Sequence, residues 1–217
     1  MKIRSMLRKM LAAAAGVCVL SAMAAEKPAA KGSPKILIAF FSYSGNTRAA
    51  ARQIQQKVGG DLFEIKPAKA YPSNYKSCVA IAKKEILAGH LPPLAEEIDI
   101  SKYSIIFIGS PNWWGTIAPP VGTFIKNNNI AGKTIIPFFT HGGGGMQKCE
   151  SDVQKYCEAG NAGKILKAFT CPGSSTKEPV PELEQWAADS MKQAVAAGKT
   201  GKAKKTGKAK KTGKRKK

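Results

Sequence analysis

Apolar residues along the chain fall into short continuous runs that are separated by stretches of helical periodicity. The strongest runs lie at 36–41, 104–109 and 134–140, and weaker ones lie at 62–65 and 164–170. Continuous apolar runs are typical of strands that are buried on both faces of a sheet. Helical patterns occupy 48–58, 75–88, 119–127, 146–158 and 181–197. This alternation predicts right-handed crossovers, and therefore one α/β domain over 34–197 with a five-stranded parallel sheet.

The loop after the first apolar run is rich in hydrogen-bonding groups and leads directly into a helix. Ser42, Ser44 and Thr47 supply hydroxyl groups, and Gly45 lets the backbone approach a ligand closely. Helix N-termini present unpaired N–H groups and the positive end of the helix dipole, which favour phosphate. The loop has neither a Walker-type lysine nor the G-x-G-x-x-G dinucleotide pattern. It therefore predicts a site for a single phosphate monoester.

Two further loops follow strong apolar runs and carry unusual residues. The loop at 110–120 contains the adjacent residues Trp113 and Trp114, and an exposed indole face suits stacking on a planar heterocycle. The loop at 140–145 reads Thr-His followed by four glycines, whose N–H groups can approach the polar edge of a ring. Ligands of parallel sheets bind beyond the carboxyl ends of the strands. The three loops together therefore predict a mononucleotide-like ligand with a large flat head.

The motifs Tyr-Ser-Gly-Asn-Thr, Pro-Asn-Trp-Trp-Gly and Gly-Gly-Gly, in this order, resemble those of the small bacterial flavodoxins, and the resemblance covers about 34–197. It implies a flavodoxin-like three-layer sandwich with FMN as its cofactor. The residues implied for the FMN phosphate are Ser42, Tyr43, Ser44, Gly45, Asn46 and Thr47. The residues implied for the flavin ring are Pro111, Asn112, Trp113, Trp114, Gly115 and Thr116 in one loop, and Thr140, His141, Gly142, Gly143 and Gly144 in the other. We expect Trp114 to stack on the ring, with Trp113 as the alternative.

The chain lacks the sequence patterns of common hydrolases and metal sites. It has no G-x-S-x-G elbow and no H-E-x-x-H motif, and its cysteines are too scattered for a zinc site. We therefore expect no catalytic side chain and no metal, and any redox chemistry belongs to the cofactor. The resemblance implies a monomeric, FMN-binding electron-transfer flavoprotein with a redox partner protein. Two alternatives stay open: an FMN-dependent reductase of quinones or other small conjugated substrates, and a flavin-free binding module.

The N-terminal residues read as a targeting segment. Four basic residues precede an apolar stretch at 10–20, which is followed by Ser-Ala-Met-Ala-Ala. This order predicts a secretory signal peptide over 1–25, and so export to the periplasm or the extracellular space. A retained N-terminal anchor is the alternative. The family it resembles is typically acidic and cytoplasmic, so this chain departs from the family pattern.

The C-terminal residues form a cationic repeat. Lys-Thr-Gly-Lys-Ala-Lys occurs at 199–204 and again at 205–210, and a variant with arginine follows at 211–216. The formal net charge is +21, but 4 of the 35 basic residues lie in 1–25 and 11 lie in 199–217, so the rest carries about +6. We expect 198–217 to be a disordered tail that binds an anionic membrane or lipopolysaccharide surface. A tail without a partner is the alternative. A physiological nucleic-acid partner is not expected, because no recognition motif accompanies the lysines.

Cysteine usage agrees with an exported chain. Removal of the signal peptide would leave the four residues Cys78, Cys149, Cys157 and Cys171. An even number in an exported protein predicts disulfides among them. Cys149 and Cys157 are too far apart on one regular helix to bridge each other, so each would need another partner. Four free buried thiols are the alternative.

Overall fold

The computed structural model of the chain describes residues 34–208. The predicted signal peptide at 1–25 and the last residues of the basic tail, 209–217, lie outside the described residues. Within the described part of the chain, no helix is both long and apolar enough to cross a membrane.

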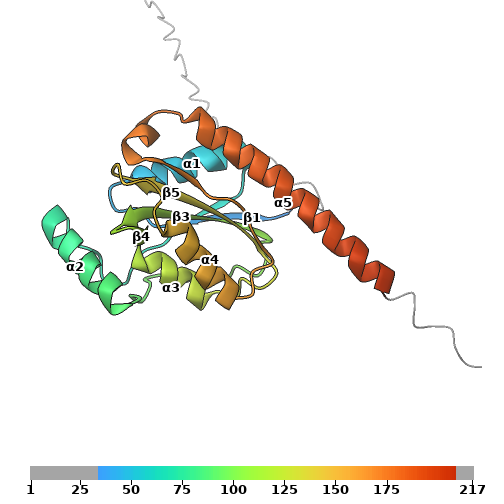
Figure 1. The fold of residues 1–217 in the computed structure, drawn as a ribbon, viewed down its shortest axis with the longest axis horizontal. Coiled ribbons are helices and arrows are strands. Elements are labelled where there is room, and N and C mark those ends of the chain that lie inside the picture. Colours follow the sequence, from blue (N-terminus) through green and yellow to red (C-terminus); the bar gives the residue numbers. More distant parts are fainter. Residues whose placement is uncertain (1–33, 209–217) are drawn as a thin grey trace, which may run out of the picture. The chain divides into compact units, whose positions relative to one another are not determined.

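A twisted parallel sheet forms the middle layer of the domain (Figure 1). Its strands are β1 (Ile36–Phe40), β2 (Asp61–Glu64), β3 (Ile105–Trp113), β5 (Thr134–His141), β6 (Lys164–Ile165) and β7 (Phe169–Pro172). The strand order is β2-β1-β3-β5-β6, and β7 also pairs with β5 in parallel. This gives five parallel positions, as predicted. The chain reverses its direction of winding between β1 and β3, so the carboxyl ends of these two strands flank the switch point at which such sheets bind ligands.

Four of the five helices cover the two faces of the sheet. The five are α1 (Asn46–Val58), α2 (Tyr75–Ala88), α3 (Pro119–Asn127), α4 (Cys149–Ala159) and α5 (Pro181–Lys208). Helices α1 and α5 lie over one face, α3 and α4 lie over the other, and α2 lies at the margin of the domain (Figure 1). Helix α2 begins where Asn74 accepts a hydrogen bond from the Ser77 N–H, and α3 begins with two prolines, which the first turn of a helix tolerates.

Alternate residues of each central strand enter two separate cores. Leu37 and Ile106 pack with α3 and α4, whereas their neighbours Ile38 and Phe107 pack with α1 and α5. All four side chains are fully buried. The apolar runs are continuous because both faces of the sheet are covered, and this is how the sequence pattern predicted a buried parallel sheet.

The predicted fifth strand at 164–170 is divided in two. Strands β6 and β7 are separated by 166–168, where the ladder with β5 is interrupted. Side chains from helices replace the missing ladder bonds: the Ala168 N–H donates to the Glu150 carboxylate at 2.8 Å, and the Trp186 Nε1–H donates to the Lys167 carbonyl at 3.1 Å. An apolar run alone does not contain these partners, so the interruption was not predictable from it.

Helix α5 extends beyond the last residue that its sequence pattern predicts to be helical. The pattern predicts an end at 197, but the helix extends to Lys208 and so includes the first part of the tail that we expected to be disordered. Once a helix has formed, each added residue gains a backbone hydrogen bond, and lysine and alanine are good helix formers. The helix bounds of α5 thus overlap the first part of the tail, and disorder of 198–217 stays a prediction.

Candidate functional site

The loop between β1 and α1 has the geometry of an anion site. Helix α1 starts after Gly45, which has φ +92° and no side chain with which to cap the helix. The Ser42 hydroxyl is buried and accepts a hydrogen bond from the Arg48 N–H at 3.2 Å. The first-turn amides of Asn46 and Thr47 therefore remain available to a bound anion.

The first loop touches the third loop through two hydroxyl groups. Thr47 lies in the first turn of α1 and Thr140 lies near the end of β5, and both are buried. Their Oγ1 atoms are 2.8 Å apart and share one hydrogen bond. This bond fixes the start of α1 against the carboxyl end of β5.

The second loop is a tight hairpin rather than the irregular loop predicted for 110–120. Strand β3 runs on to Trp113 and pairs in antiparallel fashion with β4 (Thr116–Ile117). The two turn residues, Trp114 and Gly115, both have positive φ, 55° and 87°, as a type I′ turn requires. The turn signal was missed because tryptophan is rare at a left-handed position, where Asn or Gly is usual.

Asn112 holds the hairpin and joins it to the third loop. Its Oδ1 accepts a hydrogen bond from the Gly115 N–H at 2.9 Å. Its Nδ2 donates to the Gly145 carbonyl at 2.7 Å. One amide side chain therefore sets both the turn and its distance from the glycine-rich loop.

Trp113 joins the hairpin to the first loop. Its ring is half-buried and packs edge-on against Tyr43, Phe41 and Tyr71, at centroid distances of 6.1, 5.3 and 5.0 Å. Tyr43 is itself anchored, because its hydroxyl donates to the Pro72 carbonyl at 2.8 Å. Such edge-to-face contacts are favourable aromatic geometries. The predicted phosphate loop and the predicted ring loop thus meet at Tyr43 and Trp113.

Trp114 points to a different part of the molecule. Its Nε1–H donates to the Val79 carbonyl of α2 at 3.2 Å, and the Lys83 ammonium lies 4.7 Å from the centre of its ring. Of the two tryptophans, Trp113 is therefore the one in contact with the first loop.

A cavity of about 310 Å³ lies between these groups and α2. Its lining consists of Tyr43 from the first loop, Asn112, Trp113 and Trp114 from the hairpin, and Tyr75, Cys78, Val79 and Ala82 from α2. Burial raises the pKa of the Cys78 thiol, although a hydrogen bond with Tyr43 opposes the rise. Burial and the Cys78 thiol also raise the pKa of Tyr43. At neutral pH the cavity wall is therefore uncharged.

The third loop presents backbone groups to solvent. Gly142, Gly143 and Gly144 are exposed, and a Cβ on Gly142 or Gly143 would contact no other atom within 4 Å. The His141 Nδ1 accepts a hydrogen bond from the Gly143 N–H at 3.1 Å, which orders the start of the loop.

The short helix η1 (Gly173–Lys177), which follows β7, is part of the site and was not predicted. A Cβ on Gly173 would lie 2.5 Å from the Asn46 side chain. The Thr176 hydroxyl lies 3.1 Å from the Asn46 carbonyl. The segment Pro-Gly-Ser-Ser-Thr at 172–176 follows a strand in the same way as the first loop, and this was the available signal.

The charged neighbour of the first loop is already paired. The Arg48 guanidinium makes a two-pronged ion pair with Glu64, with Nε and Oε2 3.0 Å apart. Its side chain therefore steadies α1 against β2, and a bound phosphate would rely on backbone amides and hydroxyl groups.

The four cysteines within the described residues are free and buried, so the predicted disulfides are not present in the structure. Cys149 and Cys157 both face the core beneath α4, and Cys171 lies on β7. The alternative prediction, of buried thiols, matches this arrangement.

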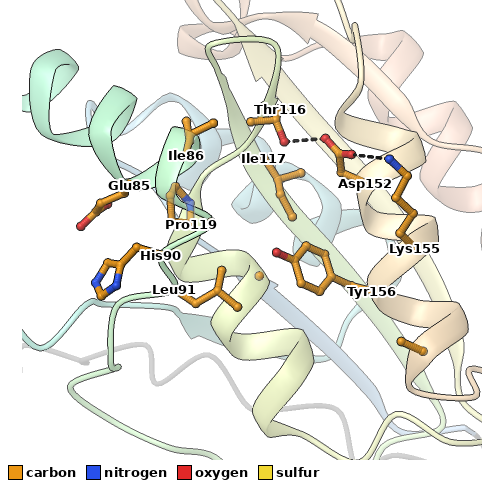
Figure 2. Close-up of a pocket in the computed structure, with 13 residues that line it drawn as sticks. Glu85, Ile86, His90, Leu91, Thr116, Ile117, Pro119, Asp152, Lys155 and Tyr156 are labelled. Atoms are coloured by element: carbon orange, nitrogen blue, oxygen red, sulfur yellow. Dashed lines mark hydrogen bonds and ion pairs between the residues drawn. The ribbon is translucent and has the colours of Figure 1, made fainter.

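A larger cavity of about 380 Å³ lies behind the hairpin, between α2, α3 and α4 (Figure 2). At its edge the Thr116 hydroxyl donates to the Asp152 carboxylate, which also pairs with Lys155 at 3.4 Å. Helix α4 therefore anchors β4 through Asp152.

Comparison with known proteins agrees with this arrangement. Residues 35–187 match the model of a protein family described as flavodoxin. A candidate flavoprotein from Bacteroides uniformis is 30% identical, with a TM-score of 0.60, over 71% of this chain and 97% of that chain. A flavoprotein from Lactobacillus acidophilus, solved in complex with FMN, is 26% identical, with a TM-score of 0.53, over 67% of this chain and 97% of that chain. A search among curated proteins gives no match. On the strength of the family match and the shared fold, the chain belongs to the flavodoxin family.

Proposed function

We propose that this protein binds FMN and acts as an electron-transfer flavoprotein. The observation that carries the proposal is that the three predicted loops contact one another in pairs. Thr47 bonds to Thr140, Asn112 bonds to Gly145, and Tyr43 packs on Trp113. Residues more than ninety positions apart in sequence thereby form one site at the switch point of the sheet.

The residues present fit a flavin mononucleotide. The first-turn amides of Asn46 and Thr47 and the hydroxyls of Ser42, Ser44 and Thr47 would hold the phosphate. Trp113 would contact the ring, and Gly142 and Gly144 would offer backbone N–H groups to its polar edge. When bound, FMN supplies chemistry in steps of one or two electrons. The protein's own groups bind and orient it and shield one side of it from water.

An FMN titration, followed by flavin fluorescence and the visible spectrum, tests the proposal. Thr47→Val removes a hydroxyl from the phosphate loop and should weaken binding at least about tenfold. Thr134→Val, at the opposite end of β5 from Thr140, is the matched control and should leave the affinity unchanged. A folded protein that does not bind FMN would contradict the proposal and favour the flavin-free binding module.

The same titration distinguishes the two tryptophans. Because Trp113 lies among the three loops and Trp114 lies against α2, Trp113→Leu should weaken FMN binding about tenfold. Trp114→Asn should change it much less. The reverse order of effects would assign the ring contact to Trp114, the residue that the sequence favoured.

A second function is supported by the cavity of about 310 Å³ beside Trp113. Its uncharged wall suits a small conjugated molecule, so an FMN-dependent reductase of quinones is the alternative. Steady turnover of a reduced nicotinamide with a quinone, by the FMN-loaded protein alone, would favour the reductase. A carrier would need a separate reductase.

We also propose that the protein is exported after removal of 1–25, on the basis of the basic, apolar and small-residue order of that segment. N-terminal sequencing of the protein from its native compartment would test this. An intact Met1 would contradict it.

A further inference from the structure

The exposed apolar side chains of the protein are concentrated around α2. Among the residues whose side chains the structure describes, 34–196, the large hydrophobic side chains classed as exposed are Tyr75, Ile81, Leu87 and Trp114, at 72, 38, 78 and 54% exposure. Three of them belong to α2, and the fourth donates a hydrogen bond to it. Concentrated exposed apolar surface on a soluble domain usually marks an interaction site.

The outer surface of α2 is also cationic. Lys76, Lys83 and Lys84 are exposed, whereas the acidic residue of the helix, Glu85, is half-buried and accepts a hydrogen bond from the Tyr71 hydroxyl. Positions 76, 80, 83, 84 and 87 follow helical spacing and form one stripe, with Leu87 at its end. The buried residues of α2, Cys78 and Ala82, lie on the opposite face. The stripe is therefore a positively charged face that ends at Leu87, with Tyr75 and Ile81 exposed on either side of it, and its residues are all exposed.

Trp114 is exposed in a backbone conformation that is unfavourable for tryptophan. A tryptophan with φ 55° occupies a left-handed conformation that costs about 1 kcal/mol or more, and its ring is more exposed than buried. Asparagine would suit the turn better. The fold therefore gains little from this side chain, and its place beside Lys83 suits recognition of a partner.

The face adjoins the proposed cofactor site. Trp114 lines the cavity of about 310 Å³ together with Tyr43 and Trp113, whereas the α2 residues that line it include Cys78 and Ala82, on the side of the helix opposite the lysines. Figure 1 shows α2 at the margin of the domain, beyond β4. A partner that binds the outer face of α2 and covers Trp114 would therefore lie next to the three loops.

We infer that the outer face of α2 and Trp114 form the docking surface for an acidic electron-transfer protein. This inference rests on the proposed function for the identity of the partner as a redox protein. Carboxylates of the partner pair with Lys76, Lys83 and Lys84, and an apolar patch covers Trp114 and Leu87. Opposite charges guide the encounter, and the desolvated tryptophan contributes most of the affinity.

Titration of the full-length, ¹⁵N-labelled protein with an acidic plant-type ferredoxin, followed by NMR, tests the inference. Chemical shifts should change in 75–88 and at the Trp114 indole N–H. The double variant Lys76→Glu/Lys84→Glu should bind the ferredoxin about fivefold more weakly than Lys126→Glu/Lys164→Glu. Both variants have the same net charge, but Lys126 ends α3 and Lys164 begins β6, far from the carboxyl edge of the sheet. The basic tail is present in both variants, so their difference reports on α2.

Trp114→Asn provides a second test that preserves the turn. It should weaken ferredoxin binding about threefold or more without lowering the melting temperature. Equal weakening in the two lysine variants, or shift changes only outside α2, would overturn the inference. Shifts in α2 that depend on protein concentration alone would assign the face to a second copy. Shifts with phosphatidylglycerol vesicles but not with ferredoxin would assign it to a membrane. The NMR titration does not require FMN, so a failure to bind ferredoxin can be distinguished from a failure to bind FMN.

Discussion

The hydroxyl groups of Thr47 and Thr140 lie 2.8 Å apart, although 93 residues separate them in the chain. Both side chains are buried, and among residues 34–208 this contact is the one hydrogen bond of either hydroxyl. The bond joins the helix that would hold a phosphate to the strand that leads into the glycine-rich loop. It makes the relative position of two loops depend on two single oxygen atoms.

Removing one hydroxyl of this pair should therefore destabilise the protein more than removing both. Thr47→Val or Thr140→Val leaves a buried polar partner unsatisfied and should lower the free energy of unfolding by about 1–3 kcal/mol. The double variant replaces both groups with apolar ones and should recover most of that loss. Urea unfolding of the four proteins measures the cycle, and additive losses would contradict the proposed pairing.

Gly45 should be required for cofactor binding as well as for the turn. Its φ of +92° is strained for alanine, so Gly45→Ala should lower the free energy of unfolding by about 1–2 kcal/mol. Gly132, with φ +70° in the turn before β5, has no atom within 4 Å of an added Cβ and is the matched control. Both variants should lose stability, but only Gly45→Ala should weaken FMN binding. Equal FMN affinity in both would show that the first loop does not bind the phosphate.

The sequence predicted the elements and the edge of the sheet that carries the site, because both follow from local patterns. Continuous apolar runs such as Ile105–Ile108 identify strands that are buried on both faces. The hydroxyl-rich loop before Arg48 and the Gly-rich loop after Thr140 follow such strands, and parallel strands place them at one edge.

The contacts that complete the site were not predictable, since they join residues that local patterns treat separately. The packing of Gly173 on Asn46 depends on how η1 meets α1. The division of the last strand depends on Glu150 and Trp186, which belong to helices. Trp113 lies against the first loop and Trp114 lies against α2 because the hairpin has a turn that tryptophan rarely adopts.

Asn112 should couple the hairpin to the glycine-rich loop. Asn112→Ala removes the hydrogen bonds to the Gly115 N–H and the Gly145 carbonyl, and it should lower the free energy of unfolding by about 1–2 kcal/mol. Backbone NMR shifts should change in both 113–116 and 142–146. Asn127→Ala, in the last turn of α3, is a control at an exposed residue with no side-chain hydrogen bond among those described. Changes limited to the hairpin would show that the two loops move independently.

The C-terminal repeats should bind anionic surfaces through charge alone. Eleven basic residues in 199–217 should hold the protein on phosphatidylglycerol or lipopolysaccharide vesicles at low salt, with about 1 kcal/mol contributed by each residue near the surface. Binding should decline as salt shortens the screening length. A chain that ends at 197 should remain unbound in a vesicle sedimentation assay but keep its FMN affinity. If the shortened chain still bound the vesicles, the folded domain and not the tail would be the part that binds them.

Buried thiols should make the protein less stable at alkaline pH. Burial raises the pKa of Cys149 and of Cys157 to about 12, from an ordinary value of 9.0. Between these values the unfolded chain has lost the thiol protons while the folded chain keeps them, so the free energy of unfolding falls as pH rises. Each thiol contributes a slope of up to about 1.4 kcal/mol per pH unit.

Urea unfolding at about pH 8 and about pH 10 measures this slope, and Cys149→Ala/Cys157→Ala is the comparison. The variant loses buried contacts and should be less stable at the lower pH, but its stability should fall less between the two. An equal slope in both proteins would show that the thiols do not titrate, as expected if they were oxidised. A thiol reagent then separates the two cases in a chain that begins at residue 26, which lacks Cys18: the folded protein protects Cys78, Cys149, Cys157 and Cys171, and the unfolded protein exposes four reactive thiols only if no disulfide has formed.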